Sequence, residues 1–358
     1  MNNNQPTVFS LFSGGGGIDI GFLKAGYNVV YATDIWDLAC QTLSLNNPNT
    51  VVECNDIRQL NCNELMPKLD LGTVDCIVGG PPCPPYSKSR FYLKNKKRSL
   101  EDEDSFTLNE YFRVVEELKP KVFFFENVFG FVYKPHREAL IYLQKRSEEL
   151  GYTLSHHVIN CANYGVPQIR DRFICIGVKN SFPKFIFPEE THINPDKLNG
   201  NLKKKPWVTC REAIGDLDYP LEEDESMQAG SRHKELLKLV PPGDNYLYFT
   251  ENRGYPNPIF KWRSRYWSFL LKLSPDKPSW TIQASRSNNM GPFHWSNRFL
   301  RIDEIKRIQT FDDDYQLVGN IKDQWRQIGN ALPPLVAQLF AEAIKDQIFW
   351  GNTNRDLY

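Results

Sequence analysis

Strands and helices alternate along the first half of this chain, and this alternation constrains the fold more than any other feature. Apolar runs rich in β-branched and aromatic residues occur at 7–12, 28–34, 75–80 and 121–128. Amphipathic segments separate them at 16–26, 37–46 and 107–118. Since the strands are apolar almost throughout, both of their faces are expected to be covered. The pattern predicts an α/β fold with a doubly wound, mostly parallel sheet.

The composition of the sequence changes from about Phe185. Residues 183–260 are rich in Pro, Gly, Asn and charge, with few long periodic segments, which predicts a loop-rich second module. Near the C-terminus, 333–349 carries apolar residues at helical spacing behind two prolines, which suit a helix N-terminus. We therefore expect a larger domain at 1–185, a smaller one at 186–320, and a segment at 321–358 that returns to the first.

Composition excludes several classes of protein. With 41% hydrophobic residues among 358, the chain can bury a globular core. No stretch approaches the ~20 apolar residues of a membrane helix, and the start lacks the pattern of a secretory signal. The 43 basic and 43 acidic residues cancel, which excludes a highly basic nucleic-acid coat but not local patches of charge. We expect a cytoplasmic monomer that does not contact the membrane.

Eight cysteines occur in the chain, at 40, 54, 62, 76, 83, 161, 175 and 210, without a C-x-x-C pair. This spacing argues against a zinc site or a dense disulfide scaffold. Reduced thiols in a cytoplasmic compartment fit better, and no metal is expected.

Each predicted strand ends in a distinctive set of residues. Gly14–Gly17 follow the first strand, Asp34 ends the second, Pro82 and Cys83 follow the third, and Glu126 ends the apolar part of the fourth. Because the carboxyl ends of parallel strands form one edge of a sheet, these sets are expected to meet where ligands bind.

The glycine cluster behind Phe12 opens a predicted helix. Glycines there let a ligand approach the backbone closely, although a tight turn would also explain them. The spacing is not the G-x-G-x-x-G of dinucleotide binders. Asp34 lies about 20 residues further on, where an acid can hold ribose hydroxyls. An adenosine-containing ligand is favoured, and it need not carry a pyrophosphate.

Cys83 lies between prolines in the sequence GGPPCPPYS. Prolines support neither helix nor ladder hydrogen bonds, so the segment is predicted to be a stiff loop. A buried structural cysteine is the ordinary alternative, but a thiol fixed beside a ligand edge is better explained as a nucleophile. The basic segment that follows, 88–98, is either a solvated loop or a cover for a polyanion.

Charged residues follow the later strands. Glu126 emerges from an apolar strand, and partial desolvation would raise its pKa so that it acts as an acid or neutral donor; a capping or salt-bridged glutamate is the alternative.

Arg170 and Arg172 are two residues apart, so in a strand both side chains lie on the same face. They could clamp a phosphate or hold a carboxylate, or they could form surface salt bridges. Residues 253–301 hold nine Lys or Arg against Asp276 alone, interleaved with tryptophans that suit a nucleic-acid surface or the core.

Six of these segments resemble the sequence blocks of the cytosine-C5 DNA methyltransferases, and they occur in the order found in that family. The matching segments are 12–17 (FSGGGG), 79–83 (GGPPC), 126–128 (ENV), 168–172 (QIRDR), 298–315 and 327–334 (QIGNALPP). Two positions depart from the family: Asp34 replaces a more usual Glu, and Pro84 follows the cysteine where Gln is common.

The resemblance implies an S-adenosylmethionine-dependent methyltransferase sheet at 1–185 and a target-recognition domain at 186–320. Asp34 would take the ribose hydroxyls, Ile35 would pack on adenine, and Asp56 would accept the adenine amino group. The residues implied at the cofactor are Phe12, Gly14, Gly15, Gly16, Gly17, Asp34, Ile35, Asp56, Ile57, Pro82, Asn330 and Ala331.

The resemblance also implies a covalent mechanism on duplex DNA. The thiolate of Cys83 would add to carbon 6 of a flipped-out cytosine, and neutral Glu126 would donate to N3. Arg172 would contact the base carbonyl or its phosphate, with Arg170 supporting the loop. The residues expected to contact DNA are Ser87, Lys88, Arg90, Arg263, Arg265 and Arg286. A role in restriction–modification or phage defence follows from the bacterial modification enzymes of this type.

Three alternatives remain open at this stage. A tRNA cytosine-C5 methyltransferase would keep the same catalytic set, although the long recognition region favours DNA. A DNA-binding regulator with an inactive site is disfavoured because Cys83, Glu126 and both arginines are present. A nicotinamide-dependent oxidoreductase is disfavoured by the glycine spacing and leaves Cys83 and Glu126 unexplained.

Overall fold

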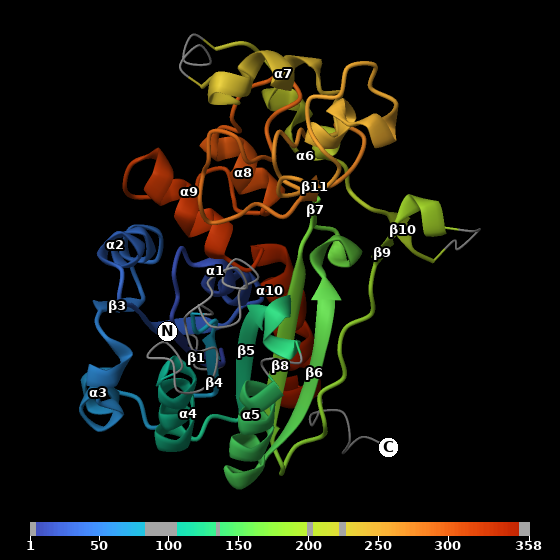
Figure 1. Ribbon diagram of the computed structural model, residues 1–358. Helices are drawn as coiled ribbons and strands as arrows, with labels where there is room; N and C mark the ends of the chain where they lie inside the picture. Colours follow the sequence, from blue (N-terminus) through green and yellow to red (C-terminus); the bar gives the residue numbers. More distant parts are fainter. Residues whose placement is uncertain (1–4, 83–105, 134–136, 199–202, 222–226, 351–358) are drawn as a thin grey trace. The chain divides into compact units, whose positions relative to one another are not determined.

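The computed structural model describes residues 5–82, 106–133, 137–198, 203–221 and 227–350 (Figure 1). These residues group into two compact units. The first unit takes the described residues up to Asn160, then Asp171–Glu189, and those from Ala331 onward, and the second takes Cys161–Arg170 and Glu190–Asn330. Residues 161–170 and 321–330 thus group with the second unit. From the sequence, the smaller domain was expected to begin at 186 and to end at 320.

A seven-stranded sheet forms the centre of the first unit, in the order β3-β2-β1-β4-β5-β8-β6. Its strands are β1 (Thr7–Leu11), β2 (Asn28–Asp34), β3 (Val51–Cys54), β4 (Cys76–Gly79), β5 (Val122–Val128), β6 (Tyr152–Asn160) and β8 (Asp171–Lys179). Neighbours from β3 to β5 run parallel, whereas β8 is antiparallel to both β5 and β6. The predicted mostly parallel sheet is confirmed.

Helices cover both faces of this sheet. They are α1 (Gly17–Lys24), α2 (Asp37–Asn46), α3 (Cys62–Lys68), α4 (Phe106–Leu118), α5 (Arg137–Glu149) and α10 (Pro334–Ile344). The ring of Phe124 in β5 contacts Phe22 of α1 and Phe340 of α10, with centroids 5.7 and 6.2 Å away. The next ring, Phe125, contacts Tyr111 of α4 at 5.5 Å. Successive side chains of β5 are therefore buried on opposite faces, as its unbroken apolar run predicts.

Two glycines let α1 lie directly against the C-terminal segment of the chain. A Cβ on Gly17 would lie 2.3 Å from the carbonyl oxygen of Leu332, and one on Gly21 would lie 2.4 Å from the Cβ of Ala337. No side chain fits at such distances, so both positions need glycine. This packing is the reason that α10, and the π-helical turn Lys345–Trp350 behind it, belong to the first unit.

The second unit consists of short elements joined by long loops. Its helices are α6 (Cys210–Ile214), α7 (Lys234–Leu239), α8 (Ile302–Ile308) and α9 (Ile321–Asn330), and its strands are β7 (Gln168–Ile169), β9 (His192–Ile193), β10 (Lys205–Pro206) and β11 (Ser279–Trp280). Strand β7 pairs with β11, and β9 with β10. A separate core gathers around Leu237, Phe249 and Leu270, so the unit has its own hydrophobic centre.

Candidate active site

Glu126 and Arg172 form a nearly buried ion pair between neighbouring strands of the first unit. Glu126 lies near the carboxyl end of β5, and Arg172 is the second residue of the antiparallel β8. The Nε atom of Arg172 lies 2.8 Å from Oε1 of Glu126, and the two side chains are 10% and 11% exposed. Arg172 Nη1 also donates to the carbonyl oxygen of Asp171 at 2.8 Å, which orients the guanidinium. A nearly buried ion pair near the carboxyl end of a sheet strand is a candidate functional group, because ligands of open α/β sheets bind at that edge.

The segment behind β4 is built around Glu126 and its neighbour. A Cβ on Gly80 would lie 2.8 Å from Oε2 of Glu126, so a side chain at this position would press on the carboxylate. Asn127 Nδ2 donates to the carbonyl oxygen of Pro81 at 3.2 Å. The chain that leads to Cys83 is thus attached to β5 by a buried side chain.

Several predicted site residues fall outside the described residues. Cys83, Ser87, Lys88 and Arg90 are among them. Their roles stay predictions. Pro82, the last residue described before them, is exposed.

The glycine loop adopts the backbone conformation that glycine permits. Phe12, Gly14 and Gly16 have φ angles of 54°, 53° and 81°, which lie in the left-handed region. A Cβ on Gly14 would meet nothing within 4 Å, so the space beside this residue is open. The amide of Gly14 donates to Oδ2 of Asp34 at 2.8 Å, which joins the ends of β1 and β2.

Asp34 and Ile35 offer the two surfaces that an adenosine requires. The amides of Gly14 and Trp36 each donate to one oxygen of Asp34, and a carboxylate oxygen can accept more than one hydrogen bond, which suits a ribose hydroxyl as a further donor. Ile35 is 71% exposed, which is unusual for an isoleucine and suits the apolar face of a base. These features fit an adenosine-containing ligand.

The other residues expected at the cofactor lie in varied surroundings. The carboxylate of Asp56 accepts from the amide of Arg58 at 3.0 Å and pairs with its guanidinium, and these interactions hold the pKa of Asp56 below its usual range. Ile57 is 6% exposed and belongs to the hydrophobic core. Ala331 is half-buried in the first unit, and Asn330 is exposed at the end of α9 in the second.

Arg170 has surroundings very different from those of Arg172. It is fully buried, and its guanidinium donates to the carbonyl oxygens of Ile282 at 2.9 Å and Gly329 at 2.7 Å. Gln168, two residues earlier, accepts from the amide of Ile282 at 3.1 Å. Arg170 therefore joins separate segments of the second unit.

The segment Lys261–Trp267 forms an exposed basic and aromatic surface of the second unit. All seven of its residues are exposed, and Trp262 and Trp267 keep 42% and 51% of their surface accessible. Trp280 of β11, at 41%, makes an edge-to-face contact with Trp267 at 5.7 Å. Arg263 and Arg265 belong to this surface. We call these residues, Lys261–Trp267 and Trp280, the aromatic–basic surface.

Arg286, another arginine expected at DNA, packs against other side chains of the second unit. Its guanidinium stacks 3.7 Å from the centroid of the Phe299 ring and contacts the sulfur of Met227 at 3.5 Å. Burial lowers the pKa of this half-buried guanidinium, and its contacts with Phe299 and Met227 show that it packs within the unit.

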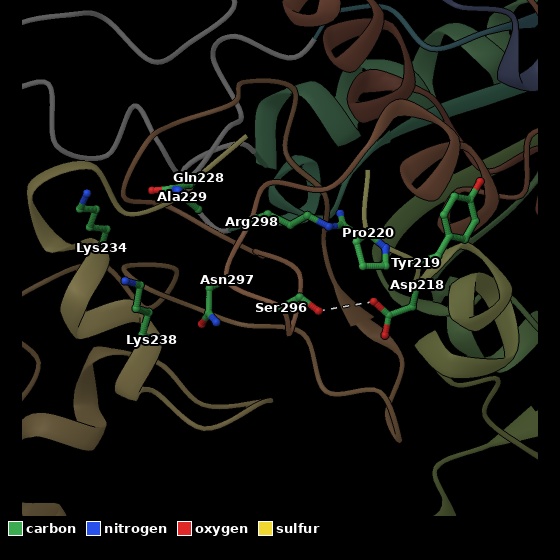
Figure 2. Close-up of a pocket in the computed structure, with 10 residues that line it drawn as sticks. All are labelled: Asp218, Tyr219, Pro220, Gln228, Ala229, Lys234, Lys238, Ser296, Asn297 and Arg298. Carbon is green, nitrogen blue, oxygen red and sulfur yellow. Dashed lines mark hydrogen bonds between the residues drawn. The ribbon is translucent and has the colours of Figure 1, made fainter. Parts of the chain in front are cut away.

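A pocket of about 480 Å³ also opens on the second unit (Figure 2). Its lining residues are Asp218, Tyr219, Pro220, Gln228, Ala229, Lys234, Lys238, Ser296, Asn297 and Arg298. Figure 2 shows the hydroxyl of Ser296 directed at Asp218, and Arg298 is held by Glu304 at 2.6 Å. The lining thus mixes both signs of charge, with Lys234 at one side. Sequence patterns did not predict this pocket because its walls come from separate segments.

Comparisons with known proteins by family model, by sequence and by structure all point to DNA methyltransferases. A family model described as C-5 cytosine-specific DNA methylase matches residues 7–346. The chain is 38% identical to the type II methyltransferase M.SacI of Streptomyces achromogenes, over 97% of this chain and 94% of that protein. It is 32% identical to the type II methyltransferase M.NgoFVII of Neisseria gonorrhoeae, over 93% and 84%.

A solved structure has a similar fold. It belongs to a candidate DNA modification methyltransferase encoded within a prophage of E. coli, with a TM-score of 0.71, 21% identity, and coverage of 96% of this chain and all of that one. Among the described residues, no helix is long and apolar enough to span a membrane, and no group of three or more His, Cys, Asp or Glu could hold a metal ion.

Proposed function

The chain belongs to the C-5 cytosine-specific DNA methylase family, and from this membership we propose that it methylates carbon 5 of a flipped-out cytosine within a specific duplex DNA sequence. The methyl donor is S-adenosylmethionine, and the reaction passes through a covalent bond between Cys83 and carbon 6 of the base. The type II relatives further support a role as the modification enzyme of a restriction–modification system.

The ion pair of Glu126 and Arg172 carries this proposal. Its two side chains are almost excluded from solvent, and they lie beside Gly80, three residues before Cys83. A carboxyl group and a guanidinium together match the N3 and O2 atoms on one edge of cytosine. Gly80 leaves room for this carboxylate directly beside the segment that leads to Cys83.

The chemistry follows from the weak nucleophilicity of carbon 5. Addition of the Cys83 thiolate to carbon 6 breaks the C5–C6 double bond and makes carbon 5 the nucleophilic end of an enamine. The ion pair with Arg172 favours the charged form of Glu126, so the carboxylate must take up a proton when the base binds. Protonated in this way, Glu126 donates to N3 and stabilises the charge that develops on the ring, while Arg172 holds the base oxygen. After carbon 5 is methylated, it loses its proton to a base, and the Cys83 thiolate leaves as the double bond is restored.

The residues that would hold the cofactor surround the glycine loop. When bound, S-adenosylmethionine supplies a methyl group on a positively charged sulfur. Gly14 leaves open space for it, Asp34 would bind the ribose hydroxyls, and Ile35 would pack on the adenine. Asp56 would need to turn from Arg58 to accept the adenine amino group.

The aromatic–basic surface supports DNA as the substrate. Its arginines can neutralise phosphates, and its exposed tryptophans can pack on sugars and unstacked bases. Flipping the target cytosine is necessary because carbons 5 and 6 are shielded within a stacked duplex.

Two experiments test the proposal. Bisulfite sequencing of DNA from cells that express the chain should reveal methylated cytosines in one sequence motif, and the absence of any would contradict it. In vitro, transfer of labelled methyl groups to duplex DNA but not to tRNA would separate the DNA enzyme from a tRNA methyltransferase.

A third experiment tests the covalent step. Duplex DNA with 5-fluorocytosine at the target cannot lose a proton from carbon 5, so it should trap the protein in a complex that survives denaturation. The Cys83→Ser variant should bind this DNA without forming the complex. An inactive DNA-binding regulator would bind the DNA but would form no covalent complex with it, even with Cys83 present.

A further inference from the structure

Two cysteines that the proposed function does not use lie next to the segment assigned to adenosine. Cys40 of α2 is 5% exposed, whereas Cys54, the last residue of β3, is exposed. Both thiols are free, and Cys54 is the one exposed cysteine among those that the structure describes. An accessible thiol next to a buried one is typical of cysteines that form a disulfide reversibly, because the buried thiol can react with the oxidised surface thiol.

The two sulfur atoms converge on the backbone of Asp34 and Ile35. Cys40 Sγ lies 3.3 Å from the carbonyl oxygen of Asp34 and 3.8 Å from that of Glu53. Cys54 Sγ lies 3.7 Å from the carbonyl oxygen of Ile35, and Cys54 is opposite Asp34 in the register of β2 and β3. The two thiols thus donate to consecutive carbonyl groups of the segment that would bind adenosine.

The thiols also interact with each other, and their environments differ in a way that decides where oxidation begins. A hydrogen bond joins Cys40 to Cys54. Burial raises the pKa of Cys40 to about 12, and the interaction with the Cys54 thiol adds to this increase. Because the thiolate is the reactive form, buried Cys40 is protected from solvent oxidants, and their attack starts at Cys54.

We propose that Cys40 and Cys54 form a reversible disulfide that weakens cofactor binding at Asp34 and Ile35. The inference rests on the proposed function for the identity of the cofactor. In the reduced protein each thiol donates to one of the two carbonyl oxygens, whereas a disulfide has no S–H group to donate. Bond formation also requires the sulfurs to come closer together than hydrogen-bonded thiols do. Both effects change the backbone of the segment that would hold the ribose and the adenine.

The oxidant is a small-molecule disulfide such as oxidised glutathione. The Cys54 thiolate attacks one of its sulfurs, the S–S bond of the oxidant breaks, and the first small thiolate leaves and takes up the proton that Cys54 lost. The Cys40 sulfur then attacks the Cys54 sulfur of the mixed disulfide, and the second small thiolate leaves with the Cys40 proton. The two cysteines lose two electrons and two protons, and the oxidant gains both as it becomes two thiols.

The first test measures the disulfide and the affinity for S-adenosylmethionine in the same samples. Protein is treated with oxidised or reduced glutathione, freed of it, digested without reduction for mass spectrometry, and titrated by calorimetry. We expect a pair of peptides joined through Cys40 and Cys54 after oxidation, and a loss of affinity of about tenfold that dithiothreitol reverses. Absence of this pair, or its presence with an unchanged affinity, would overturn the inference.

Two variants separate this disulfide from other thiol reactions. Cys54→Ser keeps a hydroxyl that can donate to Ile35, and its affinity should be the same before and after treatment with oxidised glutathione. Cys83→Ser should lose affinity as the unaltered protein does, because the proposed nucleophile takes no part in the disulfide. If Cys54→Ser also loses affinity on oxidation, a different thiol causes the effect and the inference is wrong.

A second measurement needs no variant. If the disulfide weakens cofactor binding about tenfold, saturating cofactor must lower the equilibrium constant for forming the disulfide by the same factor. The ratio of oxidised to reduced protein at a fixed glutathione ratio should therefore fall when S-adenosylmethionine is added, and an unchanged ratio would contradict the inference. Failure of the reduced protein to bind S-adenosylmethionine would overturn the proposed function as well, whereas the other adverse outcomes concern this inference alone.

Discussion

Asn127 holds the segment that leads to Cys83, because its Nδ2 donates to the carbonyl oxygen of Pro81 at 3.2 Å. Its Oδ1 accepts from the amide of Val128 at 2.9 Å, so both ends of the amide are used. The side chain is 3% exposed, and water cannot readily replace a bond lost there.

Asn127→Asp should slow methylation while leaving cofactor binding intact. The carboxylate can still accept from Val128 but cannot donate to Pro81, and it would repel that carbonyl oxygen. We expect the single-turnover rate on duplex DNA to fall by about 10- to 100-fold, the equivalent of roughly 1–3 kcal/mol. Asn180→Asp is the control, since the side-chain amide of Asn180 is exposed and its Oδ1 accepts a hydrogen bond from the hydroxyl of Thr153. Equal rates for both variants would show that Asn127 does not position the nucleophile segment.

The pair of Glu126 and Arg172 should behave as one unit in a double-mutant cycle. Glu126→Gln cannot supply an acidic proton, and Arg172→Lys removes the Nε that faces Oε1. We expect each single change to lower the methylation rate by about 100-fold or more, and the double variant to lose little beyond the worse single one.

The control for this cycle is the partly exposed pair of Glu149 and Arg146 on α5, 2.9 Å apart. The same substitutions there should leave the rate unchanged, since surface ion pairs contribute little. Losses at Glu126 and Arg172 that simply multiply would mean that the two residues act separately.

Sequence patterns predicted the sheet where strands are apolar throughout. The runs at 7–12, 28–34, 75–80 and 121–128 correspond to β1, β2, β4 and β5. The short β3 and the edge strand β6 have partly exposed faces, so their sequences lack the unbroken apolar signal. The direction of β8 was not predictable either, because an antiparallel strand buried on both faces reads like a parallel one.

The positions of candidate site residues were predictable where a residue ends an apolar run, and not where packing decides them. Asp34 and Glu126 could be named as candidates because each ends an apolar run of the sequence. Arg170 and Arg172 look equivalent at strand spacing, yet the chain passes between the two units after Arg170, and the two guanidiniums have different partners.

Lys272 should make the stability of the protein depend on pH. Its side chain is 2% exposed, its Nζ donates to the carbonyl oxygen of Val240 behind α7, and burial lowers its pKa from 10.5 to about 8. Between pH 8 and 10.5 the unfolded chain binds more protons at this residue than the folded one, so the free energy of unfolding should rise with pH.

The measurement is urea unfolding at pH 7 and pH 9, compared with Lys272→Met. The unaltered protein should gain about 1 kcal/mol relative to this variant over that interval, since one pKa unit is worth about 1.4 kcal/mol and solvent screens part of it. Lys277→Met, at an exposed lysine nearby, should track the unaltered protein. If Lys272→Met shows the same change in the free energy of unfolding between pH 7 and pH 9 as the unaltered protein, burial of the Lys272 ammonium does not destabilise the fold at pH 7.

Arg263 and Arg286 should respond differently when DNA binding is measured against salt concentration. Arg263 is exposed on the aromatic–basic surface, whereas Arg286 stacks on Phe299 and contacts Met227. Removing a contact to one phosphate lowers the slope of log affinity against log salt by about 1. Arg263→Gln should therefore reduce that slope and leave the melting temperature unchanged. Arg286→Gln should lower the melting temperature and leave the slope intact, because its guanidinium packs inside the unit. An Arg263→Gln variant with the original slope would mean that DNA binds on a different face of the second unit.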